Sequence, residues 1–105
     1  MQLKTHVAGY RVGHYADQLG LVKTGPVQLV REPENIYDPN AIRLDYEGRK
    51  LGYVPRAHST VLAKLIDSGT ITVEAHINCE TLPHDILLTI EIEKVVGGVD
   101  ENKST

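Results

Sequence analysis

The sequence has 105 residues, which is the size of one small domain with a single hydrophobic core and too short for two domains of ordinary size. Its formal net charge of −3 excludes proteins that coat nucleic acid through bulk electrostatic attraction, so any contact with a polyanion has to be local. The single cysteine, the lack of a secretory signal in the first residues and the lack of an apolar run of membrane-spanning length predict a cytoplasmic protein with no membrane contact.

Strand-like segments follow one another along most of the chain. Residues 41–46 carry apolar side chains at every second position and turn back at Glu47–Gly48, which is typical of a tight hairpin. Residues 70–78 alternate in the same way, which predicts a half-buried strand. The full set of predicted strands covers residues 4–10, 27–31, 41–46, 50–54, 70–78 and 86–93.

One amphipathic helix is predicted at residues 57–67. Ser59 is predicted to cap its start, and Gly69 follows its end. Its apolar residues recur at helical spacing and are predicted to pack on the core; they are Val61, Leu62, Leu65 and Ile66.

The order of these elements predicts the fold class. Six short strands with one helix, at the spacing of a meander, favour a small barrel or strongly curled sheet over alternating β-α-β units. Residues 1–96 are predicted to form this domain, which is mainly β with one or two short helices. Residues 97–105 have no apolar pattern and are predicted to be a disordered tail.

The most polar connection lies between the second and third predicted strands. Asn35, Tyr37 and Asp38 stand within four residues of one another, and Asp38 precedes a proline, which predicts a tight turn at residues 38–40. An amide, an aromatic ring and a carboxylate so close together favour a binding site. The same residues can also build a turn and nothing more, so both interpretations stay open at this point.

Three separated motifs, in this order, resemble the HIRAN domain, a module of helicase-like transcription factors that also occurs as a stand-alone bacterial protein. The resemblance covers residues 6–88. The motifs are Ala8-Gly9-Tyr10-Arg11, then Asn35-x-Tyr37-Asp38-x-Asn40-Ala41-Ile42, and finally Leu51-Gly52-Tyr53-Val54-Pro55-Arg56.

The resemblance implies a six-stranded antiparallel β-barrel of the OB/SH3-like kind that binds the 3′-hydroxyl end of single-stranded DNA. Asp38 would accept a hydrogen bond from the terminal 3′-OH, Tyr37 would stack on the terminal base, and Asn35 would support the same site. Arg11 and Arg56 would hold phosphates. It also implies a role in DNA repair or at stalled forks, with a helicase or nuclease as a partner.

Two positions depart from the DNA-end-binding members of the family. Val12 stands where those members carry a second stacking tyrosine, and Tyr53 stands where they carry a histidine. Binding of 3′ ends is therefore either weaker here or depends on other rings. Those rings are Tyr10, His14, Tyr15 and Tyr53, and of these Tyr53 is included as a candidate site residue.

Other functions have weaker signals. His76, Cys79 and His84 match no closed zinc pattern, and no nucleophile elbow or phosphate-binding glycine loop is present, so neither a metal, a cofactor nor a catalytic role is predicted. The alternative to DNA binding is a protein-interaction or oligomerisation module that keeps the barrel, which the acidic net charge and Val12 would allow. The oligomeric state is not predicted.

Overall fold

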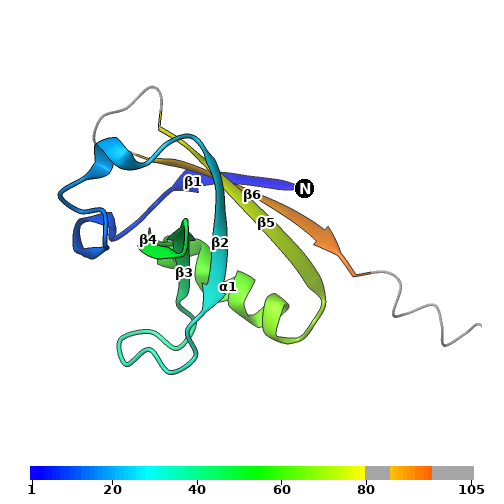
Figure 1. Cartoon of the computed structure of the whole chain (residues 1–105). Helices are drawn as coiled ribbons and strands as arrows, with labels where there is room; N and C mark the ends of the chain where they lie inside the picture. The colour runs from blue at the N-terminus through cyan, green and yellow to red at the C-terminus, as the bar shows by residue number, and fades with distance from the viewer. Residues whose placement is uncertain (80–85, 96–105) are drawn as a thin grey trace, which may run out of the picture.

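The computed structural model describes residues 1–79 and 86–95, and in these ranges the chain forms a six-stranded sheet with one α-helix and two short 3-10 helices (Figure 1). The predicted tail at 97–105 lies outside the described residues. None of the helices within the described ranges is long and apolar enough to cross a membrane. In chain order the elements are β1 (Gln2–His6), η1 (Tyr10–Val12), η2 (Leu19–Leu21), β2 (Gly25–Arg31), β3 (Ile42–Tyr46), β4 (Arg49–Tyr53), α1 (Arg56–Asp67), β5 (Ile71–Asn78) and β6 (Leu87–Lys94).

The strands pair in the order β1-β6-β5-β2-β3-β4, and every neighbouring pair is antiparallel. β2 pairs with β5 through its first half and with β3 through its second half, so the sheet curls around this strand. The two ends of the order meet where Ala8, just after β1, exchanges backbone hydrogen bonds of 2.8 and 2.7 Å with Tyr53 of β4. The prediction of a mainly β fold with six curled antiparallel strands is confirmed.

The core lies on the concave face of this curled sheet. β3 contributes Ile42, Leu44 and Tyr46, which are all buried, as the alternation of the sequence predicts. β5 likewise buries Ile71, Ala75 and Ile77 and packs the partly buried Val73 against the core, while the side chains that alternate with them, Thr72, Glu74 and His76, face outward. Tyr15 packs edge-on against Tyr46 and donates a 3.0 Å hydrogen bond to its carbonyl oxygen, so this ring is part of the core and does not supply a stacking surface.

The first strand differs from the sequence-based expectation of residues 4–10. It begins at Gln2 and ends at His6; Gly9 then adopts a left-handed conformation with φ 68° and the chain enters η1. Only Ala8 returns to strand pairing, through the isolated bridge to Tyr53.

The helix also differs in two respects from the sequence-based expectation. It begins at Arg56 with Pro55 at the N-cap position, so Ser59 is not the cap but a buried residue of the first turn. Val61 is exposed, whereas Leu62 and Ala63 are buried. Leu65 and Ile66 are partly buried and pack against the core, so Leu62, Leu65 and Ile66 of the predicted stripe face the core and Val61 does not. In Figure 1, α1 lies at the bottom of the molecule, between the β3–β4 hairpin and β5.

Candidate functional site

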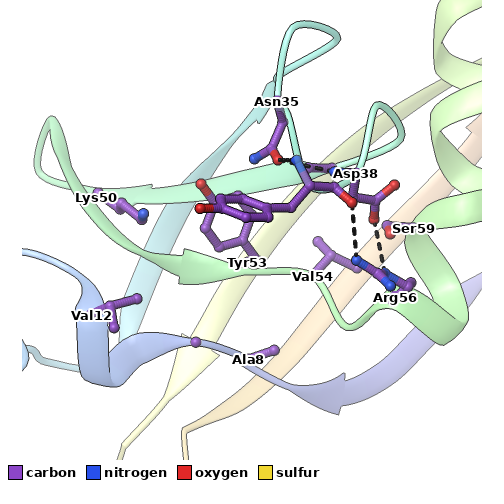
Figure 2. A pocket seen from close by; sticks show the side chains of 12 residues that line it. Ala8, Val12, Asn35, Asp38, Lys50, Tyr53, Val54, Arg56 and Ser59 are labelled. Atoms are coloured by element: carbon purple, nitrogen blue, oxygen red, sulfur yellow. Dashed lines mark hydrogen bonds and ion pairs between the residues drawn. The ribbon is translucent and has the colours of Figure 1, made fainter.

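A groove of about 470 Å³ lies where the β2–β3 loop, the start of α1 and the segment after β1 meet β4. The groove is lined by five of the six residues that the sequence singled out, namely Asn35, Tyr37, Asp38, Tyr53 and Arg56. Figure 2 shows Asn35 and Asp38 on one side of Tyr53, and Val12 and Ala8 on the other. Long-range folding thus brings together residues from the second and third motifs.

Arg11, the sixth predicted residue, does not line the groove. It lies in η1 beside Val12, which does line it, and its guanidinium carbon is 5.3 Å from the centre of the Tyr10 ring. Arg11 is therefore placed near the rim, where its charge can act on a long ligand that leaves the groove but not on a group held inside it.

Asn35 organises the loop that carries the other polar residues. Its side-chain oxygen accepts hydrogen bonds from the backbone N–H groups of Tyr37 at 2.8 Å and Asp38 at 3.0 Å, which is an Asx turn. Its amide nitrogen donates to the carboxylate of Glu32 at 3.0 Å. Both groups of the side chain are engaged in shaping the loop, so its role at the groove is to fix the backbone of the next residues.

Asp38 combines a turn-forming role with exposure to the groove. One carboxylate oxygen accepts the backbone N–H of Asn40 at 2.9 Å, and the other accepts Nε–H of Arg56 at 3.2 Å. The side chain keeps 18% of its surface exposed. An ionised carboxylate has about four lone-pair sites, so each oxygen retains the capacity to accept another hydrogen bond from a ligand.

Arg56 is held at the loop by a second contact, a 3.4 Å hydrogen bond to the carbonyl oxygen of Tyr37 (Figure 2). It is also the first residue of α1, and among the described residues no side chain caps that end of the helix. The positive end of the helix dipole therefore adds to the guanidinium charge at this side of the groove.

The rings of Tyr37 and Tyr53 differ in how firmly they are held. Tyr37 is 83% exposed, which contradicts the interpretation that this ring only packs on the barrel. Tyr53 is half-buried and donates its hydroxyl hydrogen to Glu32 at 2.8 Å. The groove thus has a free aromatic surface on its loop side and a fixed aromatic wall on β4.

Lys50 is a groove residue that the sequence analysis missed. Its ammonium nitrogen lies 4.7 Å from the centre of the Tyr53 ring, a cation–π contact. Strict alternation along β4 would place these two side chains on opposite faces. The pairing register steps from Leu44–Gly52 to Asp45–Lys50, so β4 holds one extra residue that brings Lys50 and Tyr53 to the same side.

A partly buried polar network contacts the Tyr53 hydroxyl. Glu32 accepts Nη1–H of Arg43 at 2.9 Å, and Arg43 in turn makes two hydrogen bonds, at 2.8 and 3.1 Å, to the buried carboxylate of Asp45. Partial burial raises the pKa of Glu32, but the hydrogen bonds from Asn35, Tyr53 and Arg43 outweigh this effect, and the net pKa is below its ordinary value. Glu32 is therefore ionised at neutral pH.

Arg31 lies beside this site but has a structural role. Its guanidinium donates two 2.8 Å hydrogen bonds to Asp67 at the end of α1. It also donates to the carbonyl oxygens of Ala41 at 2.7 Å and Pro39 at 3.1 Å. These contacts tie the second half of the β2–β3 loop to the helix. Within the described ranges no cluster of three or more metal-ligating side chains occurs.

The HIRAN domain family model matches residues 2–95, nearly the whole described chain. Among curated proteins, 49 residues are 53% identical to a putative SWI/SNF-related matrix-associated actin-dependent regulator of chromatin, subfamily A member 3-like 1, of Arabidopsis thaliana, and cover 46% of this chain. A second stretch of 64 residues is 36% identical to a Fanconi-associated nuclease 1 homolog of Oryza sativa subsp. japonica, and covers 57% of this chain. The matches span only 6% and 7% of those proteins.

Solved structures share the fold. The crystal structure of the HIRAN domain of human HLTF superposes with a TM-score of 0.70 at 23% identity, over 98% of this chain and 80% of that one. The NMR structure of the same domain in its DNA-bound conformation gives 0.69 at 24% identity, over 98% and 80%. A protein from Lactobacillus plantarum gives 0.66 at 25% identity, over 89% of this chain and 99% of that one.

Proposed function

This chain belongs to the HIRAN domain family, and on that premise we propose that its groove binds the 3′-hydroxyl end of single-stranded DNA. The observation that carries the proposal is the exposed Tyr37 ring, which is held on an ordered loop beside the Asp38 carboxylate and the Arg56 guanidinium. The fold it shares with a HIRAN domain that was solved in a DNA-bound conformation supports the same ligand class.

The chemistry of each group suits the end of a strand. The terminal base stacks on Tyr37, an interaction worth about 1–3 kcal/mol that tolerates any base. The terminal 3′-OH donates to Asp38, which accepts hydrogen bonds only and repels a phosphate at that position. Arg56 and Lys50 contact the preceding phosphates from the two sides of the groove, and Arg11 contacts the strand at the rim.

The modest number of cations predicts the character of binding. Only Arg56 and Lys50 line the groove as cations, and the chain carries a net charge of −3. Few phosphates are therefore neutralised, and the affinity should be micromolar or weaker with a shallow dependence on salt. Weak binding of this kind suits a module that delivers a strand end to a partner enzyme. We therefore propose a non-catalytic role of residues 1–96 in DNA repair, alongside a helicase or nuclease.

The test compares two short oligonucleotides that carry a 5′ fluorescent label and end in either a 3′-OH or a 3′-phosphate. Fluorescence anisotropy of the wild-type chain should show tighter binding of the 3′-OH ligand. Asp38→Asn keeps an acceptor for the N–H of Asn40 but loses the charge, so the preference should shrink because the phosphate is no longer repelled. Asp17→Asn, an exposed carboxylate outside the groove, is the matched control. Equal wild-type affinity for both ligands would end the proposal of hydroxyl sensing.

A protein-interaction module is the second candidate function. The observation that favours it is Ile36, which is 86% exposed beside Tyr37 at the tip of the β2–β3 loop. Ile36 and Tyr37 are consecutive and both exposed, and adjoining exposed apolar side chains are more typical of contacts between proteins than a single one is. If neither oligonucleotide binds, and light scattering shows a concentration-dependent mass that Ile36→Ser abolishes, this second function is the correct one.

A further inference from the structure

Glu32 touches residues that support both walls of the groove. It directly follows β2, at the start of the β2–β3 loop, and is half-buried, with 21% of its side chain exposed. The same carboxylate oxygen, Oε1, accepts from the Tyr53 hydroxyl at 2.8 Å and from the Asn35 amide at 3.0 Å. Glu32 thereby joins the β4 wall to the loop that carries Tyr37 and Asp38.

The other carboxylate oxygen is fixed from behind. Oε2 accepts from Arg43 at 2.9 Å, and Arg43 is clamped by two hydrogen bonds to the buried Asp45. Arg43 is also the direct cross-strand partner of Tyr53 on β3 and β4. Glu32 is therefore a rigid link between β3, β4 and the loop, because the group that anchors it is itself held within the sheet.

We propose that Glu32 is a positioning residue, which sets the separation of the Tyr53 wall and the Tyr37 loop so that the groove is formed before a ligand arrives. The part of this inference that concerns affinity for DNA rests on the proposed function. Its physical basis is that a preformed site loses less conformational freedom on binding than a mobile loop does. Glu32 contacts no ligand in this scheme and acts only through Tyr53 and Asn35.

A purely electrostatic role and a positioning role of Glu32 predict opposite changes in DNA affinity when its carboxylate is removed. A carboxylate near the groove repels phosphates, so its loss should tighten the binding of DNA if charge is all that matters. A positioning role predicts that binding weakens. The sign of the change in affinity therefore separates the two explanations, which is unusual for a charged residue beside a nucleic-acid site.

The experiment uses Glu32→Ala, Glu32→Gln and the matched control Glu34→Ala, which removes an exposed carboxylate from the same loop. Glu32→Ala should weaken binding of the 3′-OH oligonucleotide by about fivefold or more. Glu34→Ala should leave the affinity unchanged or raise it. Glu32→Gln should fall in between, since its amide oxygen still accepts from Tyr53 while its NH₂ group cannot accept from Arg43. A Glu32→Ala chain that binds as tightly as the wild type, or tighter, overturns the proposal.

A readout without DNA separates this inference from the proposed function. The backbone N–H groups of Tyr37 and Asp38 are bonded to Asn35, so their hydrogen exchange, followed by NMR, reports the order of the loop. Exchange should be faster in Glu32→Ala and in Glu32→Gln than in the wild type, and unchanged in Glu34→Ala. Unchanged exchange in the Glu32 variants overturns the positioning role whether or not the wild type binds DNA. Glu32→Gln carries this test if Glu32→Ala does not fold.

A double-mutant cycle identifies the route through which Glu32 acts. Tyr53→Phe keeps the ring and removes only the hydroxyl that donates to Glu32. If Glu32 holds that ring, Tyr53→Phe weakens DNA binding in the wild type and has a smaller effect when Glu32 is already Ala. Equal effects in both backgrounds would overturn the link between the two residues.

Discussion

Gly52 is the residue at which a single added methyl group should damage both stability and the groove. A Cβ at this position would lie 2.5 Å from the carbonyl oxygen of Ala8, 2.6 Å from Cγ1 of Val7 and 3.3 Å from the backbone nitrogen of Tyr10. Real Cβ contacts below 3.0 Å essentially never occur, and a backbone carbonyl cannot rotate away as a flexible side chain does. Gly52→Ala therefore forces the segment after β1 away from β4.

The cost follows from what that segment does. Ala8 and Tyr53 exchange two backbone hydrogen bonds, which join the two ends of the strand order. Overpacking costs about 1–3 kcal/mol, and each lost hydrogen bond adds about 0.5–1.5 kcal/mol. Because part of the clash is relieved when the bonds open, we expect a loss of about 2–4 kcal/mol in the free energy of unfolding. For a domain of this size that corresponds to a fall of roughly 10–20 °C in Tm.

Thermal unfolding followed by circular dichroism measures this loss. Gly20→Ala is the matched control, because no heavy atom of residues 1–79 and 86–95 lies within 4 Å of its added Cβ and its φ is not in the left-handed region. Its Tm should stay close to that of the wild type. Below its Tm, Gly52→Ala should also bind the 3′-OH oligonucleotide more weakly, since Ala8 and Val12 form the wall that moves. If the two variants melt at the same temperature, the closing bridge is not the constraint that the distances indicate.

Two further predictions concern the rings and the acid stability. Tyr37→Ala should weaken DNA binding by about 5- to 100-fold with little change in Tm, because the ring is exposed and its loss removes one stacked base. The control is Ile36→Ala, which changes the exposed neighbour outside the groove lining and should bind DNA like the wild type. Equal losses of affinity for the two variants in an anisotropy titration would refute the stacking role. The pKa of Glu32 is lower in the folded chain than its ordinary value of 4.5, so its contribution to stability is complete above that pH and is lost as the pH falls through the folded pKa. Glu32→Gln should therefore be less stable than the wild type at pH 7 and lose less stability on acidification, as measured by urea unfolding from pH 7 to pH 3. If the free energies of unfolding of the two chains fall in parallel with pH, this prediction is contradicted. Part of the acid sensitivity should persist in the variant, because Arg31 also lowers the pKa of Asp67.

Several features were predictable because they depend on short stretches of sequence. The alternation in β3 and β5 correctly identified the buried faces, since side chains on a strand point to opposite sides in turn. The hairpin at Glu47–Gly48 was predictable for a similar reason, and both residues have positive φ, at 49° and 80°, as a tight turn of this type requires. The resemblance to the HIRAN domain also depended on local motifs, and it is confirmed by the family match.

The errors concern features that no local pattern reports. The helix has its cap at Pro55 and exposes Val61, because the tertiary packing of α1 decides which of several apolar stripes is buried. Lys50 was missed as a groove residue because the extra residue in β4 interrupts the alternation on which strand predictions rely. The role of Glu32 was missed because two of its three partners, Tyr53 and Arg43, lie 21 and 11 residues away in the chain.

The sequence by itself determined the kind of chain this is: a mainly β domain of one family, with a polar loop whose amide, ring and carboxylate have the chemistry to bind a ligand. Only the tertiary structure decided that Tyr37 stands free while Tyr53 is fixed, and that Arg56 and Lys50 flank them while Arg11 lies at the rim. The reason is physical. Alternation, turns and caps are set by neighbours along the chain, whereas the walls of a groove are set by the register of distant strands and by hydrogen bonds between residues that meet only after folding.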